Sequence, residues 1–186
     1  MTGRGSDDPR YMNSTCRGLV AGTGDHSYPV GNTGVMTQNV EPSRKAPDKA
    51  LSLRMSRLAR RHTQPELALR RELHARGLRY RVQFRVPANR RRTIDIAFTR
   101  AVLAVFVDGC FWHGCPEHGV LPRTNTEWWT WKIARTVARD RETTRLLEES
   151  GWSVLRVWEH EAVMQAADKV TLARAAALRR RAPMTD

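Results

Sequence analysis

Hydrophobic residues recur at helical spacing in one stretch of this chain and at strand spacing in the next. The first helical stretch follows residues 63–66 (Thr-Gln-Pro-Glu), and Leu67, Leu69 and Leu73 are expected on its buried face. A threonine with a glutamate three residues later is typical of a capping box, and proline suits the first turn of a helix. Glycine is the residue type that most often follows a helix end. The pattern therefore predicts a helix that begins near residue 64 and stops at Gly77.

Three apolar runs of strand length follow this helix, at residues 80–86, 93–98 and 101–107. The arginines at 90–92 separate the first two runs, and we expect a turn there. Only residues 99–100 separate the second and third runs, so these two are predicted to pair antiparallel as a hairpin.

A second capping-box pattern at residues 124–127 (Thr-Asn-Thr-Glu) predicts a long helix over about 127–149, ended by Gly151. Residues 152–158 read as another strand, and a C-terminal helix is expected from about Glu161. A strand, a long helix and a strand in succession form a crossover, which favours a parallel pair beside the hairpin. The sequence therefore predicts an α/β fold with a mixed sheet flanked by helices.

The two ends of the chain differ from its middle. Residues 1–50 are rich in Gly, Ser, Thr, Asn, Asp and Pro without a sustained apolar period, and we expect them to be disordered. Met36 or Met55 is an alternative start of translation. The chain is long enough for one domain with a substantial core. We assign that domain to residues 51–165 and a C-terminal helix with a loose tail to 166–186.

The net charge of +13 and the isoelectric point near 11.0 indicate a polyanionic partner. Residues 51–160 hold 21 Lys and Arg against 11 Asp and Glu, and all but Lys132 of these cations are arginines. The planar arginine side chain suits phosphates and guanine edges, so we expect Arg91, Arg92 and Lys132 to contact DNA. A basic surface that merely reflects an arginine-rich proteome is the alternative.

Three cysteines, no signal-peptide pattern and no apolar run of membrane-spanning length favour a reduced cytoplasmic protein that does not enter a membrane. A disulfide between Cys110 and Cys115 would be the alternative in a secreted chain. Thiols kept reduced are available to bind a metal ion.

Residues 105–118 concentrate most of the candidate chemistry. Cys110, Cys115 and His118 have the residue types and spacing of zinc ligands, which leaves a tetrahedral site one ligand short. His160, just after the last predicted strand, is expected to complete the site. The alternative is two free thiols with solvated histidines. His113 would remain uncommitted, and a free imidazole is the better general base.

Two acids are expected to meet at the predicted hairpin. Asp95 lies between isoleucines in one strand, and Asp108 ends the neighbouring strand. Two carboxylates that converge there suit magnesium, which prefers one or two carboxylates together with water and phosphate oxygens. A salt bridge from Asp95 to one of the many arginines is the alternative.

The adjacent aromatic residues Phe111 and Trp112 suggest a contact with nucleic-acid bases. Apolar side chains that wedge between base steps are a known mode of recognition, at an unstacking cost of about a few kcal/mol per step. Packing in the core is the usual alternative. The tryptophans of the long helix receive no DNA role here, because some must belong to the core.

These residues together resemble the very-short-patch repair (Vsr) DNA mismatch endonucleases over about residues 51–161. The resemblance rests on isolated residues and on short blocks along that range. These are Met55, Glu66 in its Thr-Gln-Pro-Glu context, Asp95, Gly-Cys-Phe-Trp-His at 109–113, Lys-Ile at 132–133, Arg-Asp-Arg at 139–141 and Gly-Trp-Ser-Val-Leu-Arg-Val-Trp-Glu at 151–159.

The resemblance implies a restriction-endonuclease-like core with catalytic magnesium and structural zinc. Asp95 and the backbone carbonyl of Val107 would hold magnesium, His113 would activate the attacking water, and Glu66 would assist through metal-bound water. Met55 would join the two wedge aromatics beside the mismatch. The family's zinc ligands map onto the four Cys and His positions already singled out.

The implied activity is the nicking of one strand of double-stranded DNA beside a T·G mismatch that arises from 5-methylcytosine deamination. A monomer in the cytoplasm, associated with the nucleoid, is expected, with mismatch-repair proteins as candidate partners. Two alternatives remain: a restriction-type endonuclease of the same fold, and a zinc-containing DNA-binding module with impaired catalysis.

Four positions depart from the family pattern. Val107-Asp108 replaces the usual Thr-His, Ile94 replaces a frequent proline before the acid, and Thr136 replaces a frequent asparagine. The missing histidine removes a possible acid for the leaving group, and Asp108 is expected to strengthen metal binding instead.

Overall fold

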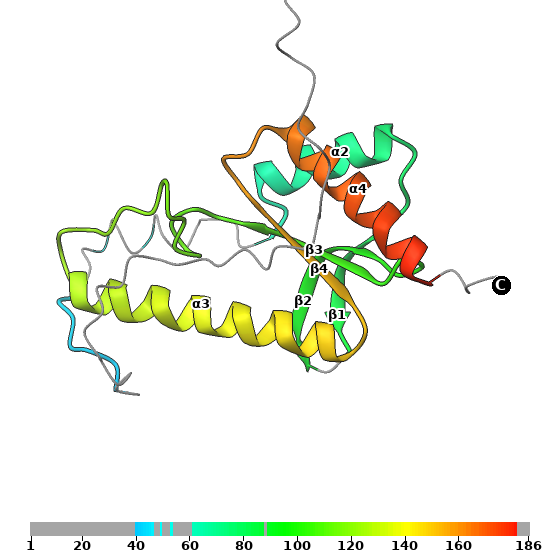
Figure 1. The fold of residues 1–186 in the computed structure, drawn as a ribbon. Coiled ribbons are helices and arrows are strands. Elements are labelled where there is room, and N and C mark those ends of the chain that lie inside the picture. Colours follow the sequence, from blue (N-terminus) through cyan, green and yellow to red (C-terminus); the bar gives the residue numbers. More distant parts are fainter. Residues whose placement is uncertain (1–39, 47–48, 50–52, 54–60, 88, 182–186) are drawn as a thin grey trace, which may run out of the picture.

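The computed structural model describes residues 40–46, 49, 53, 61–87 and 89–181 of the chain (Figure 1). The predictions for residues 1–39 and for Met55, and that of a loose tail beyond residue 183, lie outside the described residues. The elements are α2 (Gln64–Ala75), β1 (Arg81–Val86), β2 (Asn89–Phe98), β3 (Leu103–Asp108), α3 (Thr126–Glu149), β4 (Ser153–Trp158) and α4 (Val163–Arg181).

The strands form one mixed sheet in the order β1-β2-β3-β4. The first three strands are antiparallel neighbours, and β3 pairs in parallel with β4 after the crossover through α3. The predicted hairpin and the predicted parallel pair are both confirmed, as is a mixed α/β sheet with helices. None of the described helices has the length and apolar character needed to cross a membrane.

Helices cover both faces of the sheet (Figure 1). On one face α2 and α4 pack over a core that includes Leu73, Val105 and Val170. On the other face Leu147 of α3 packs against a second core with Ile94. The N-terminal half of α3 extends past the sheet toward the loop that follows β3 (Figure 1). That loop carries most of the predicted chemistry.

The two predicted capping boxes are wrong, although both helices begin where expected. Thr63 precedes α2 without a side-chain cap, and the Glu66 carboxylate accepts the backbone N–H of His62 at 3.0 Å instead. Asn125 precedes α3 in the left-handed region with φ 57°, and its side chain bonds the backbone of Lys45. In both cases a contact from outside the helix replaces the local cap.

The predicted arginine turn is also wrong. Arg90, Arg91 and Arg92 lie within β2, and the chain reverses between Val86 and Asn89, which pair with each other. Pro87 occupies the reversal, and proline cannot donate a hydrogen bond to the ladder of a sheet. The turn therefore comes at the proline and not at the charged residues.

Candidate active site and metal centre

Asp95 lies at an irregularity in β2. Ile94 packs in the core under α3, whereas Ile96 packs in the core under α2 and α4. Residues two apart in a regular strand share one face, so the strand changes face at Asp95. The facing residue on β1, Gln83, lies between two regular pairs and has a left-handed φ of 49°. The irregularity therefore places the two isoleucines that flank Asp95 in different cores, one on each face of the sheet.

One backbone donor and one side-chain donor face the Asp95 carboxylate. Its Oδ2 accepts the backbone N–H of Val107 at 3.0 Å, and its Oδ1 lies 3.5 Å from Nε2 of Gln83. The first contact brings Val107 on β3 alongside Asp95. These are the two residues that the family resemblance assigns to magnesium.

The carboxylate of Asp95 has a surplus of negative charge around it. Its pKa is raised to about 6: burial is the largest cause, the carboxylates of Glu66 and Asp108 also raise the pKa, and the Val107 N–H and Arg70 lower it. A buried acid with like-charged neighbours is stabilised in its ionised form by a bound cation. The oxygen-rich surroundings fit magnesium on this ground.

Arg70 joins Glu66 to the sheet. Glu66 is buried with 4% exposure, and its Oε2 accepts from Nη2 of Arg70 at 3.0 Å. The same nitrogen donates to the backbone carbonyl of Asp95 at 3.2 Å. Sequence reasoning did not single out Arg70, although its position four residues after a glutamate on one helix is the spacing of an ion pair. Its contact with the sheet had no local signal.

Asp108 forms an ion pair with Arg156 of β4. Its carboxylate is 3% exposed, and its two oxygens lie 2.5 Å from Nε and 2.8 Å from Nη2 of Arg156. The central carbon of the guanidinium also lies 4.8 Å from the ring centroid of Phe106. The salt bridge considered as an alternative for Asp95 is therefore found at Asp108. Its role in magnesium binding stays a prediction.

His113 contacts a carboxylate that sequence reasoning did not assign. Its Nδ1 lies 2.6 Å from Oδ2 of Asp140 on α3 and 3.5 Å from Oδ1 of Asp108. Burial disfavours the imidazolium, but the two carboxylates outweigh burial and raise the pKa of His113. The pKa of Asp140 is lowered because contacts with His113 and Arg156 outweigh its own burial. With Nδ1 engaged, Nε2 is the ring nitrogen left for proton transfer.

We call Glu66, Asp95, Asp108 and Asp140 the carboxylate cluster. Arg70 links Glu66 to the backbone carbonyl of Asp95, and Asp108 directly follows Val107, whose N–H bonds the Asp95 carboxylate. Asp140 joins through His113 and through Nη2 of Arg156 at 3.5 Å. The acid and the imidazole predicted from the sequence therefore belong to one connected group of side chains.

The four predicted zinc ligands meet and form what we call the Cys/His cluster: Cys110, Cys115, His118 and His160. Their ligand atoms all lie within 4.8 Å of one another. Sγ of Cys110 is 3.1 Å from Nδ1 of His160, and Sγ of Cys115 is 3.9 Å from Nδ1 of His118. Tetrahedral zinc with ordinary bond lengths would place such atoms about 3.5 Å apart.

The thiols of the Cys/His cluster are free and mostly buried. Cys110 and Cys115 form no disulfide, with exposures of 7% and 1%. Burial, together with the neighbouring Cys115 thiol, raises the pKa of Cys110 to about 12. A bound cation reverses that preference, because a coordinating thiol loses its proton. The donor set therefore fits a soft divalent ion such as zinc.

Phe111 and Trp112 pack in an aromatic group with Trp129 of α3. The ring centroids of Phe111 lie 5.0 Å from Trp112 and 5.1 Å from Trp129. Trp112 is 39% exposed, so part of the group faces solvent. Beside this group, the guanidinium carbon of Arg44 lies 4.4 Å from the ring centroid of Trp128. The indole N–H of Trp128 donates to Glu41 at 2.7 Å. The sequence assigned Trp129 no role, since core and surface tryptophans look alike in a helix.

The predicted DNA-contacting cations have different surroundings. Arg91 and Lys132 are exposed. Arg92 bonds α3 through Glu142 at 2.5 Å and Thr143 at 2.8 Å. Arg91 and Lys132 are therefore open to solvent, whereas Arg92 fastens β2 to α3.

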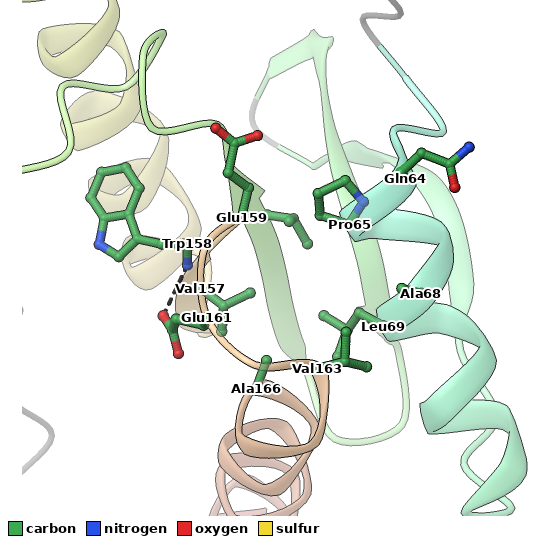
Figure 2. Close-up of a pocket in the computed structure, with 11 residues that line it drawn as sticks. Gln64, Pro65, Ala68, Leu69, Val157, Trp158, Glu159, Glu161, Val163 and Ala166 are labelled. Carbon is green, nitrogen blue, oxygen red and sulfur yellow. Dashed lines mark hydrogen bonds between the residues drawn. The ribbon is translucent and has the colours of Figure 1, made fainter. Parts of the chain in front are cut away.

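A pocket of about 250 Å³ lies at the carboxyl ends of the parallel strands (Figure 2). The first turns of α2 and α4 form its other walls, with Pro65, Leu69 and Val163 among the labelled residues (Figure 2). Val107 is the residue that it shares with the proposed magnesium ligands. The pocket therefore adjoins the carboxylate cluster from the side of α2 and α4.

Comparison with known proteins agrees with this arrangement. Residues 46–117 match the family described as DNA mismatch endonuclease Vsr. The chain is 49% identical over 106 residues to the type II nicking enzyme V.NaeI of Lentzea aerocolonigenes, covering 56% of this chain and 64% of that protein.

Two further relatives match over most of their own length. The type II nicking enzyme V.XorIIP of Xanthomonas oryzae pv. oryzae is 36% identical over 129 residues, covering 68% of this chain and 87% of the relative. The DNA mismatch endonuclease Vsr of Escherichia coli K12 is 40% identical over 116 residues, covering 60% and 71%. The chain belongs to the Vsr endonuclease family, which confirms the resemblance drawn from its motifs.

Proposed function

We propose that this protein is a magnesium-dependent DNA endonuclease that nicks one strand beside a T·G mismatch, as in very short patch repair. The observation that carries the proposal is the connected group of Asp95, Val107, Asp108, His113 and Asp140. It combines a site for a divalent ion with an oriented imidazole. Relatives named as nicking enzymes and as a mismatch endonuclease support the same class of reaction. A restriction-endonuclease-like core suits the mixed sheet and is part of the proposal.

The reaction requires a water molecule to attack the phosphorus in line with the leaving oxygen. Asp95 and the Val107 carbonyl would hold magnesium, which when bound neutralises charge on the scissile phosphate. His113 accepts the proton of the attacking water at Nε2. Asp140 holds Nδ1 and stabilises the imidazolium that results. Glu66, fixed by Arg70, is placed to orient a water molecule beside Asp95.

Structural zinc is the second part of the proposal. Cys110, Cys115 and His118 come from the loop after β3, and His160 follows β4. An ion bound by all four would fasten the loop to the parallel pair of strands. The loop also carries His113, so zinc would keep the general base near Asp95.

Double-stranded DNA is the proposed partner, bound by a monomer in the cytoplasm at the nucleoid. Phe111 and Trp112, with Met55, would wedge beside the mismatch, where weak pairing lowers the cost of unstacking. The exposed arginines would contribute affinity that falls with salt. Mismatch-repair proteins stay candidate partners.

The decisive experiment compares matched duplexes. Nicking of a T·G duplex and a T·A duplex is measured in magnesium with the wild-type protein and with Asp95→Ala. We expect the T·G strand to be nicked at least about ten-fold faster, equivalent to about 1.4 kcal/mol in the barrier. Asp95→Ala should abolish nicking while leaving DNA binding largely intact.

Two other outcomes would favour other functions. Equal cleavage of both duplexes would favour a restriction-type endonuclease, which the type II nicking relatives make the main competitor. Binding without nicking by the wild-type protein would favour a zinc-containing DNA-binding module. The replacement of the family's histidine by Asp108 is the feature that makes this last outcome worth testing.

A further inference from the structure

Gln83 has a backbone conformation that glutamine rarely adopts. It lies within β1 with φ 49°, one of four described residues other than glycine with positive φ. Left-handed backbone costs conformational energy for a residue with a long side chain, and such strain is often found at functional sites. In β1 this conformation coincides with the change of face at Asp95. Other interactions of Gln83 must offset the energetic cost of this backbone conformation.

The side chain of Gln83 lies between Thr93 and Asp95. Its Oε1 accepts the Thr93 hydroxyl at 3.2 Å, and its Nε2 lies 3.5 Å from Oδ1 of Asp95. An ionised carboxylate only accepts hydrogen bonds, so the amide nitrogen must face Asp95 and the amide oxygen must face Thr93. The threonine therefore holds the amide in the orientation that Asp95 requires.

The two carboxylate oxygens of Asp95 are thus restrained from opposite sides. Val107 on β3 restrains Oδ2, and Gln83 on β1 approaches Oδ1. The Val107 contact alone leaves the carboxylate free to rotate about the bond that joins it to Cβ. A donor on the second oxygen limits that rotation and keeps the remaining lone pairs pointing in one direction.

We propose that Gln83 is a positioning residue that holds the Asp95 carboxylate ready for a divalent cation. The inference rests on the proposed function, in which Asp95 binds magnesium. Residues that hydrogen-bond a metal ligand typically change metal affinity about 10- to 100-fold when they are removed. Gln83 does not touch the ion. Its effect reaches the ion through Asp95.

The test is a calorimetric titration of the zinc-loaded protein with Mn²⁺ in the absence of DNA. Gln83→Gly removes the amide and relieves the left-handed backbone, so it should fold as stably as the wild type or more stably. We expect its dissociation constant for Mn²⁺ to rise about ten-fold or more. Nicking should fall at limiting magnesium and recover at saturating magnesium. A residue that only shaped the strand would not produce that recovery.

Three further variants make the result unambiguous. Val102→Gly relieves a similar φ of 51° away from Asp95 and should leave Mn²⁺ affinity unchanged. Thr93→Val frees the Gln83 amide and should weaken Mn²⁺ binding in the same direction but less. Gln83→Asn tolerates left-handed backbone yet is too short to reach Asp95, so it should reproduce the glycine result if Gln83→Gly fails to fold.

Two outcomes overturn the inference in different ways. Wild-type affinity in Gln83→Gly, when Asp95→Ala has lost Mn²⁺ binding, shows that Gln83 only shapes the strand, and the proposed function stands. If the wild-type protein binds no Mn²⁺, or Asp95→Ala binds it equally, both the inference and the role of Asp95 fall.

Discussion

The carboxylate cluster and the Cys/His cluster come close together along the chain, where Asp108 belongs to the first and Cys110 to the second. The two clusters depend on the fold differently. The charges of the carboxylate cluster are compensated by the protein: Arg70 pairs with Glu66, and Arg156 pairs with Asp108. Its four members all lie on strands or helices. The Cys/His cluster consists of two buried thiols and two exposed imidazoles whose ligand atoms lie close to one another.

The difference indicates what each cluster requires from an ion. Strands and ion pairs arrange the carboxylate cluster without a metal, so the magnesium ion of the proposed reaction would be free to bind and leave with the substrate. Three members of the Cys/His cluster lie in a loop without helix or strand over residues 109–125, and the fourth, His160, follows β4. Removing zinc should therefore affect folding strongly, whereas removing magnesium should chiefly affect the reaction and change stability much less.

The largest expected effect comes from breaking the Cys/His cluster. Cys110→Ser should lose zinc and at least about 4 kcal/mol of unfolding free energy, the linkage expected for an ion present at about 1,000 times its dissociation constant. Metal analysis and urea unfolding measure the two losses, with Cys16→Ser as the matched control. A wild-type protein that contains no zinc, and is as stable as Cys110→Ser, would end the zinc proposal.

The next effect concerns the buried ion pair on the carboxylate side. Arg156→Met removes the cation between Asp108 and Asp140, and a buried pair that loses one partner costs about 3 kcal/mol or more. The double variant Arg156→Met/Asp108→Leu should recover most of that loss, because no charge is left unpaired. A urea-unfolding double-mutant cycle measures the coupling. Additive losses would mean that the pair does not compensate the cluster.

Sequence patterns predict the elements of this fold better than its polar network. Hydrophobic periods place α3 and β4 within about one residue, because burying the apolar face of each element dominates its energy. The capping box of α2 fails because the Glu66 carboxylate pairs with Arg70, which in turn donates to the backbone carbonyl of Asp95 in the sheet. A local pattern cannot show such a competition between a cap and a distant partner.

The two clusters also differ in how far the sequence predicts them. Cysteine and histidine are scarce and chemically selective, so their spacing identified all four residues of the Cys/His cluster. Carboxylates and arginines are common and pair in many ways. Asp140 and Arg156 lie 27 and 48 positions from their partners, and no local signal identified them. The Arg-Asp-Arg block at 139–141, which contains Asp140, was singled out through the resemblance to the Vsr family and not through its own chemistry.

A third prediction sharpens the role of the imidazole. Asp140→Asn should reduce single-turnover nicking about 100-fold, or about 2.7 kcal/mol in the barrier, while DNA binding stays unchanged. Asp140 raises the pKa of His113, and water activation needs the neutral imidazole. The acid limb of the rate profile should therefore move to lower pH in this variant. An unmoved limb would show that His113 is not the base.

The smallest effect tests how much the ionised Asp95 carboxylate destabilises the folded protein when no metal ion is bound. The folded-state pKa of Asp95 is raised from 3.8 to about 6, so the folded protein holds this proton more tightly than the unfolded chain does. Without magnesium, the unfolding free energy should fall as the pH rises from about 4 to about 6, by about 2 kcal/mol. Asp95→Asn should lack this slope and be more stable than the wild type at pH above about 6.

Magnesium should act on the wild type in the opposite direction, because a cation bound to the ionised carboxylate stabilises the folded state. Urea unfolding of both proteins at several pH values, with and without magnesium, measures all three effects. Asp95→Asn also keeps the size of the side chain, so a packing defect does not obscure the result. A variant less stable than the wild type at every pH would mean that the Asp95 carboxylate supports the sheet. The Asp95 carboxylate would then have a structural role and would not be a preformed ligand for a metal ion. The contrast between the two clusters would disappear.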